Sequence, residues 1–200
     1  KYNINDKVLK LYETAMNDIQ DQFKILDDIR EFNQLKVLNA FQEERISEAH
    51  FTNSSGYGYG DIGRDSLDAV YARVFNTESA LVRPHFVNGT HALGAALFGN
   101  LRPGNTMLSV CGEPYDTLHD VIGITENSNM GSLKEFGINY KQVDLKEDGK
   151  PNLEEIEKVL KEDESITLVH IQRSTGYGWR RALLIEDIKS IVDCVKNIRK

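Results

Sequence analysis

The chain has 200 residues, of which 40% are hydrophobic and 28% charged, and its formal net charge at pH 7 is −7. These proportions are ordinary for a folded globular domain, whereas the acidic balance argues against a nucleic-acid-binding protein, which usually has a basic face. No apolar run approaches the roughly 20 residues that span a bilayer, and the first ten residues lack the apolar core of a secretory signal. We expect no nucleic-acid partner, no membrane segment and, since two isolated cysteines form no disulfide pattern, a cytoplasmic protein.

The first predicted elements are helical. Apolar residues recur at spacings of three and four from residue 3 to about residue 41, as in an amphipathic helix. We expect residues 1–50 to form a helical arm that packs on a body or on a second subunit. Residues 51–65 are expected to form a loop rich in glycine and aromatic residues. Residues 66–200 are expected to be the first part of a larger domain, truncated at the C-terminus, because the chain stops directly after a predicted helix.

The rest of the chain alternates predicted helices with short apolar strands. This alternation is typical of βαβ units and predicts an α/β fold with a mostly parallel sheet that has helices on both faces. Ser66 and Asn152 are candidate N-caps. The predicted helices are Ser66–Phe75, Thr90–Leu101, one from about Asp116, Asn152–Asp163 and Ile185–Ile198, and the predicted strands are Ala80–Val87, Thr106–Val110, Ile138–Leu145 and Ile166–Gln172.

The glycine-rich loop near residue 60 has the spacing of a dinucleotide-binding turn. Gly58, Gly60 and Gly63 spell G-x-G-x-x-G. Such a turn follows a buried strand and is itself followed, about 20 residues later, by an acidic residue. The preceding sequence "ERISEAHFTNSS" contains no strand-forming run, and Glu78 comes too early. We therefore interpret the match as a coincidence of spacing.

A better anion site is predicted in "VNGTHALGAAL", which reads as a strand, a tight turn and a helix. The free N–H groups and the positive dipole end of that helix lie at Gly89, Thr90 and His91, and they favour a phosphate group. Thr90 adds a hydroxyl. Helix capping alone is the alternative explanation of this sequence.

Tyr115 follows the predicted strand Thr106–Val110. In an open α/β sheet the ligand lies beyond the carboxyl ends of the strands. The Tyr115 ring is therefore a candidate to cover one face of a flat heteroaromatic ligand near the anion site. Packing of Tyr115 against Pro114 or against a helix is the alternative.

Several stretches together resemble one known family. The chain is similar to the methionine γ-lyase-like family associated with aluminium resistance, which consists of pyridoxal-phosphate carbon–sulfur lyases of fold type I related to cystathionine β-lyase. Members are about twice as long, so the resemblance implies that this chain is the N-terminal half, with an arm and the first part of the large cofactor-binding domain. The resemblance starts near residue 30 and is carried by "SSGYGYGDIGRDSLDAVYARVF", "ALVRPHFVNGTHALGAALFGNLRPGN", "GEPYDTLHDVIGI", "GSLKEFGINYKQVDL" and "VHIQRSTGYGWRRALLIEDIK".

The resemblance implies a pyridoxal 5′-phosphate cofactor and a sulfur-containing amino-acid substrate. Gly89 and Thr90 would hold the cofactor phosphate, with His91 as a further candidate, and Tyr115 would stack on the pyridine ring. The resemblance also implies a homodimer or homotetramer whose active site is shared between subunits. It gives no residue that would explain aluminium resistance through metal binding.

The resemblance assigns the first glycine loop to the neighbouring subunit's active site. Tyr57 or Tyr59, together with Arg64, would reach the phosphate of the partner's cofactor, and the arginine fork suits a dianion. The alternative is a surface turn in which Arg64 pairs with Asp61 or Asp65.

The second glycine loop, "STGYGWRR", begins where the strand Ile166–Gln172 ends. Gln172, Arg173 and Ser174 are candidates to hydrogen-bond the cofactor's phenolic oxygen or the substrate. Arg180 or Arg181 is a candidate for the substrate carboxylate, and the sequence does not decide between them.

The catalytic residues remain unassigned, because the family's Schiff-base lysine and its acidic partner are expected beyond residue 200. No metal site is predicted, since the five histidines show no ligand spacing such as HExxH. β- and γ-elimination both stay open. The alternatives are another fold-type I enzyme of the same cofactor, such as an aminotransferase or aldolase, or a non-catalytic α/β binding module. The lysines lie in charged helices or turns, among them Lys134, Lys146, Lys158, Lys189 and Lys196.

Overall fold

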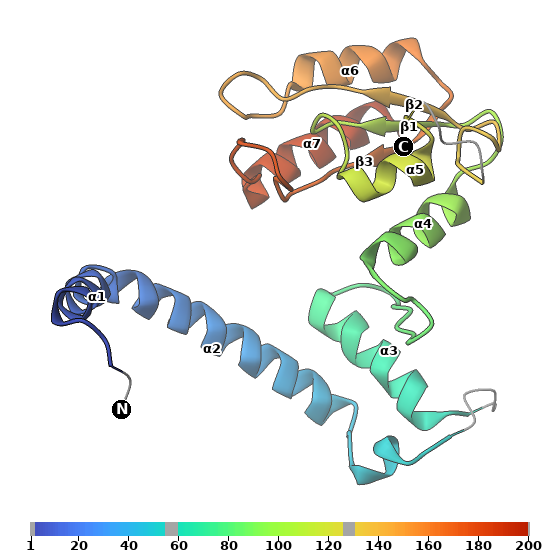
Figure 1. The fold of residues 1–200 in the computed structure, drawn as a ribbon. Helices are drawn as coiled ribbons and strands as arrows, with labels where there is room; N and C mark the ends of the chain where they lie inside the picture. The colour runs from blue at the N-terminus through green and yellow to red at the C-terminus, as the bar shows by residue number, and fades with distance from the viewer. Residues whose placement is uncertain (1–2, 55–59, 126–130, 200) are drawn as a thin grey trace. The chain divides into compact units, whose positions relative to one another are not determined.

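The computed structural model describes residues 3–54, 60–125 and 131–199. The chain forms two compact units, residues 1–85 and residues 86–200 (Figure 1). In the described part of the chain, no helix is both long enough and apolar enough to cross a membrane.

The first unit is helical. The predicted helical pattern at the N-terminus is confirmed, and it is interrupted at Ile19, where the backbone leaves the helical conformation. Asn5 caps the first helix by accepting a hydrogen bond from the Lys7 amide at 2.9 Å. The elements are α1 (Asp6–Asp18), α2 (Gln20–Glu43), the 3₁₀ helix η1 (Glu48–Phe51) and α3 (Ile62–Phe75).

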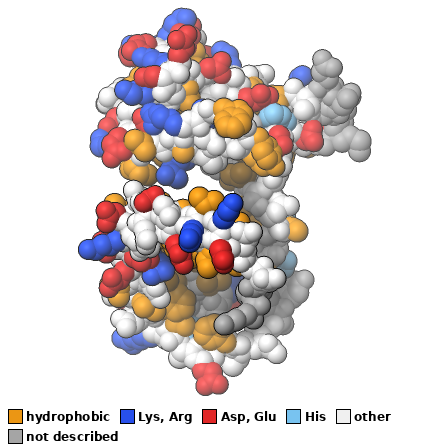
Figure 2. All heavy atoms as spheres, turned by 60° about the vertical axis from the view of Figure 1, so that its left-hand side comes forward, with side chains coloured by type: hydrophobic (Ala, Val, Ile, Leu, Met, Phe, Trp, Pro, Cys, Tyr) orange, Lys and Arg blue, Asp and Glu red, His pale blue; other side chains and the backbone are white. Residues whose placement is uncertain are grey.

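The apolar stripe of α1 and α2 lies at the surface. Along the fully described helix α1 no side chain is buried, and within α2 the buried residue is Ala40. Leu11 and Phe32 are 72% and 69% exposed. Figure 2 shows hydrophobic side chains lying among charged ones on the face in view.

Helix α3 begins earlier than the sequence predicted. Its N-cap is Asp61, whose Oδ1 accepts a hydrogen bond from the Arg64 amide at 3.0 Å, so Ser66 lies inside the helix and the prediction of Ser66 as N-cap was wrong. An aspartate is as good an N-cap as a serine and here precedes it in the chain. The loop before Asp61 includes residues 55–59, which lie outside the described residues.

The predicted strand Ala80–Val87 was also wrong, since this segment forms no regular structure. Its hydrogen bonds go to a side chain instead. Oδ1 of Asp68 accepts from the Val82 amide at 2.7 Å and from the Arg83 guanidinium at 2.8 Å. Pro84 adds no donor, so the segment cannot build a full strand ladder.

The second unit is built on a parallel sheet. It consists of β1 (Thr106–Ser109), β2 (Asn139–Gln142) and β3 (Ile166–His170) in the order β2-β1-β3. Both pairings are parallel, and all four residues of the central strand β1 are buried, as expected for a parallel strand covered on both faces.

Helices cover both faces of this sheet. Because successive side chains of a strand point to opposite faces, Met107 packs in a cluster with Leu97 and Ile122, whereas Leu108 packs in another with Ile156 and Ile191. The α/β prediction is thereby confirmed. The first face carries α4 (Gly89–Asn100), η2 (Asp116–Leu118) and α5 (His119–Ile122), and the second carries α6 (Leu153–Glu162) and α7 (Ile185–Ile198).

Candidate functional site

The carboxyl ends of β1 and β3 lie side by side and open onto a cavity of about 600 Å³. Three segments of the second unit line it. They are the start of α4, the turn that follows β1 and the segment that follows β3. The cavity therefore lies where open α/β sheets bind their ligands, and its lining includes Gly89, Thr90, Tyr115, Gln172, Arg173 and Ser174.

The N-terminus of α4 presents two unused amides to this cavity. Asn88 caps the helix by accepting from the His91 amide at 2.8 Å. Among the described residues, no acceptor takes the amide hydrogens of Gly89 and Thr90. No atom lies within 4 Å of the position that a Cβ of Gly89 would occupy. These two amides and the dipole of a 12-residue helix form a cradle that an anion fits.

The side chains next to the cradle form hydrogen bonds with nearby residues of the protein. The Thr90 hydroxyl donates to Oγ1 of Thr117 at 2.8 Å, which joins α4 to the turn after Tyr115. His91 accepts from the Val87 amide through Nδ1 at 3.3 Å, and its ring lies edge-on to Phe86. In this structure the His91 amide and ring are thus both engaged within the protein.

Tyr115 stands between this cavity and a second one of about 390 Å³. Its amide donates to Oε1 of Gln172 at 2.8 Å, so the turn after β1 is fixed to the segment after β3. Its ring is stacked on Tyr177, with centroids 5.8 Å apart and planes 26° from parallel. The aromatic contact of Tyr115 is thus with Tyr177. The hydrogen bond with Tyr177 and partial burial raise the pKa of the Tyr115 hydroxyl.

His170, the last residue of β3, also lines the first cavity. Its Nδ1 is buried and has no hydrogen-bond partner in the described chain. Burial lowers the pKa of this imidazole, so it is neutral at pH 7. A buried polar atom without a partner is rare in folded proteins, and the residue that carries it is one of those lining a ligand-sized cavity. His170 was not predicted as a site residue, because it lies inside the predicted strand Ile166–Gln172 and becomes the last strand residue only in the structure.

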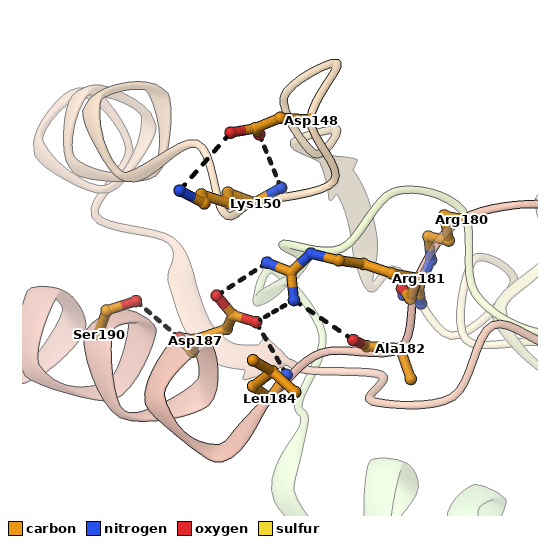
Figure 3. A network of polar contacts seen from close by, with 8 residues as sticks. All are labelled: Asp148, Lys150, Arg180, Arg181, Ala182, Leu184, Asp187 and Ser190. Atoms are coloured by element: carbon orange, nitrogen blue, oxygen red, sulfur yellow. Dashed lines mark hydrogen bonds and ion pairs between the residues drawn. The ribbon is translucent and has the colours of Figure 1, made fainter.

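The two arginines of the second glycine loop and Arg173, directly before it, have different surroundings. Arg180 donates to the backbone carbonyls of Gln172 at 3.1 Å and Ser174 at 2.7 Å. Arg181 forms an ion pair with Asp187 of α7 (Figure 3). Arg173 lines the cavity, and no ion pair of its guanidinium occurs among the described residues. Of the three, Arg173 is placed to meet an anionic ligand group.

Of the residues predicted from the first glycine loop, Arg64 is among the described residues. Tyr57 and Tyr59 lie outside the described residues. Arg64 belongs to the first unit, where its Nε donates to Oδ1 of Asp65 at 3.1 Å. In this single chain Arg64 therefore forms the ion pair with Asp65 that was named as the alternative to a role at the partner's cofactor. Its role toward a neighbouring subunit stays a prediction.

Several solved structures are similar to this chain. A carbon-sulfur lyase involved in aluminum resistance from Clostridium novyi NT is 97% identical, with a TM-score of 0.94, and the match covers 99% of this chain and 47% of that one. A candidate cystathionine beta-lyase involved in aluminum resistance from Clostridium acetobutylicum is 65% identical, with a TM-score of 0.94, and covers 100% of this chain and 48% of that one.

Sequence comparison agrees with the structural comparison. The uncharacterized protein YnbB of Bacillus subtilis (strain 168) is 44% identical over 193 residues, which make up 95% of this chain and 45% of YnbB. The chain thus spans about half the length of these relatives. The family described as Methionine gamma-lyase matches residues 8–200. Since this match covers nearly the whole chain, the resemblance seen in the sequence motifs is confirmed, and the chain belongs to the methionine gamma-lyase family.

Proposed function

We propose that the full-length protein is a pyridoxal-phosphate-dependent carbon–sulfur lyase of fold type I that acts on a sulfur-containing amino acid. The observation that carries the proposal is the meeting of the Gly89–Thr90 amide cradle with the Tyr115 ring at the carboxyl edge of a parallel sheet. The similarity to a carbon-sulfur lyase of 97% identity supports the reaction class.

The residues present fit this cofactor. A phosphate group needs free donors, and the unpaired amides of Gly89 and Thr90 offer them without the desolvation of a fixed positive charge. The heteroaromatic ring needs a flat wall, which Tyr115 supplies. A cavity of about 600 Å³ is ample for a molecule of this size.

When bound, pyridoxal phosphate acts as an electron sink, which makes removal of the substrate's α-proton and loss of a thiol from the β- or γ-carbon feasible. The chain's own residues bind and orient. Gly89 and Thr90 would hold the phosphate, and the Tyr115 ring would cover one face of the cofactor ring. Gln172 keeps the Tyr115 backbone in place through the 2.8 Å hydrogen bond. Arg173, which lines the cavity, would pair with the substrate carboxylate.

The remaining parts of the active site are assigned to elements outside this chain. A lysine that binds the cofactor covalently and an acidic partner for its ring nitrogen belong to the other half of the protein. We further propose a homodimer or homotetramer in which Arg64 and the tyrosines at 57 and 59 reach the neighbouring subunit's phosphate.

The test is a visible absorption spectrum of the full-length protein before and after borohydride. A yellow band that borohydride abolishes is expected, followed by release of a thiol and a keto acid from cystathionine or methionine. Thr90→Val should weaken cofactor binding, whereas Thr14→Val, a change of the same kind on the exposed face of α1, should not. A protein that stays colourless with added pyridoxal phosphate would contradict the proposal. Transamination without thiol release would instead assign it to another enzyme class of the same cofactor.

A further inference from the structure

The segment 172–180, which we call the brace loop, folds back onto Tyr115. It leaves β3 at Gln172 and turns at Thr175, whose carbonyl accepts from the Gly178 amide at 2.9 Å. Tyr177, near its tip, stacks on the Tyr115 ring. The loop therefore places an aromatic side chain against the ring that lines the candidate cofactor cavity.

The closeness of this approach depends on a glycine. Gly176 has a φ of +57°, a region that favours glycine. A Cβ at this position would lie 2.8 Å from Cδ2 and 3.1 Å from Cε2 of Tyr115. Any larger residue would push the loop away from the ring. The second glycine–aromatic–glycine motif of the sequence is thus explained by a contact between backbone and ring.

The base of the brace loop is closed by Arg180. Its guanidinium donates to the carbonyls of Gln172 and Ser174, which lie at the start of the same loop. Gln172 in turn accepts from the Tyr115 amide. One loop therefore holds Tyr115 twice, by its backbone and by its ring. Arg180 therefore stabilises the conformation of the brace loop, and its guanidinium is already engaged in hydrogen bonds to the backbone.

The burial pattern argues against ordinary core packing as the reason for the Tyr177 stack. Tyr177 is 83% exposed, and among the described residues Tyr115 is its only ring contact. Burial of Tyr177 therefore adds little stability. Tyr115 lines both cavities, whereas Tyr177 lines only the second. Tyr177 thus contacts Tyr115 from outside the cavity that contains the amide cradle.

We infer that Tyr177 is a positioning residue, which holds the Tyr115 ring in the orientation that covers the cofactor's heteroaromatic ring. The inference rests on the proposed function, because it assigns Tyr115 the same ligand. It predicts that the brace loop contributes to binding of the ring but not of the phosphate. The two contributions can be separated with two probes, pyridoxal phosphate and inorganic phosphate.

The experiment uses the full-length protein freed of cofactor and measures the Kd of each probe. Tyr177→Leu and Gly176→Ala are expected to weaken pyridoxal phosphate binding about three- to tenfold, the range for loss of one aromatic pair. Both variants should leave the phosphate Kd within about twofold, since the cradle of α4 is untouched. Tyr177→Phe keeps the ring stack and removes only the hydroxyl that bonds to Tyr115, so it should restore most of the affinity if the stack is what positions Tyr115. Trp179→Leu, a loss of a fully exposed aromatic in the same loop, is the matched control.

Two results would overturn the inference alone. An unchanged Kd for pyridoxal phosphate in Tyr177→Leu would show that Tyr115 needs no brace. An equal loss for both probes would show that the loop supports the fold of the whole site. Failure of the wild-type protein to bind pyridoxal phosphate would instead overturn the proposed function, and the role of Tyr177 with it.

Discussion

Arg181 holds Asp187 in a two-pronged ion pair, with Nη1–Oδ2 and Nη2–Oδ1 distances of 2.7 and 3.1 Å (Figure 3). Asp187 also accepts from the Leu184 amide at 2.8 Å, at the first turn of α7. This pairing raises the pKa of Arg181 and lowers that of Asp187. Arg181, which the sequence offered as an alternative to Arg180 for binding the substrate carboxylate, thus stabilises the first turn of α7 through Asp187.

The different surroundings of Arg181 and Arg173 predict that their substitution affects stability in one case and substrate binding in the other. Arg181→Ala should lower the melting temperature by about 3 °C and leave the KM for substrate unchanged, because its partner is structural. Arg173→Ala should leave the melting temperature unchanged and raise KM about tenfold or more, since a lost charge-assisted bond affects binding. Calorimetry and steady-state kinetics on the full-length enzyme measure both quantities. A KM increase in Arg181→Ala would refute the assignment.

Gly123 should not tolerate a side chain. It ends α5 with a φ of +90°, and a Cβ there would lie 2.7 Å from the Ser132 hydroxyl oxygen and 2.8 Å from Cβ of Lys134. Gly123→Ala is therefore expected to lower the free energy of unfolding by at least about 2 kcal/mol. Denaturant unfolding is the measurement.

Gly99→Ala is the matched control for this substitution. Gly99 lies inside α4 with nothing within 4 Å of its Cβ position, so alanine should be neutral or stabilise by up to about 1 kcal/mol. Equal effects of the two substitutions would mean that the close approach at Gly123 is not a real constraint.

A bound anion should compensate for the stability that is lost when the N-cap residue of α4 is removed. Asn88→Ala removes the acceptor of the His91 amide and should cost about 1 kcal/mol in the absence of ligand. It also leaves a third free amide beside those of Gly89 and Thr90. Added phosphate should therefore recover part of the lost stability in thermal unfolding.

Asn152→Ala provides the comparison. Asn152 caps α6 by accepting from the Glu155 amide, away from the cavity that contains the cradle. A similar cost is expected, and phosphate should not recover it. If phosphate restores both variants or neither, the anion cradle is not at α4.

Asp163 should make stability depend on pH in the acidic range. Its carboxylate pairs with Lys141 of β2 at 2.7 Å and accepts from the Ser165 amide and hydroxyl at 2.9 and 2.6 Å, which lowers its pKa to about 2. Because the folded pKa lies below the unfolded value of 3.8, the stabilisation is complete above about pH 4 and is lost as the pH falls toward 2.

The measurement compares wild type with Asp163→Asn by urea unfolding at pH 7, 5 and 3. The substitution should cost about 1 kcal/mol at pH 7, a value reduced for screening by solvent, and the difference should shrink at pH 3. Asp148→Asn, at an exposed carboxylate, should show neither effect. A difference that grows on acidification would contradict the assigned direction.

Elements with a strong local signal could be predicted from the sequence. Helix α7 has the predicted bounds, and α6 starts after the predicted cap Asn152, because an apolar period of 3.6 and a capping residue agree at both places. The segment Ala80–Val87 has strand-forming residues as well. It fails as a strand because the Asp68 side chain, distant in sequence, takes its backbone and side-chain donors.

The parts of the candidate site whose position depends only on the order of strands and helices could be predicted from the sequence. Tyr115 and Gln172 follow neighbouring parallel strands, so their presence at the same edge of the sheet follows from the fold. The Tyr115–Tyr177 stack and the unpaired Nδ1 of His170 depend on side-chain packing across the site, which no local pattern encodes.

The order β2-β1-β3 has a consequence for synthesis on the ribosome. The central strand β1 is the first of the three to be translated, and β2 and β3 are then added one on each side. Each new strand finds a partner edge already made, so the sheet can grow outward while the chain emerges. An exposed edge persists at each stage, and a pause after β2 would leave β1 open on the side that β3 later covers.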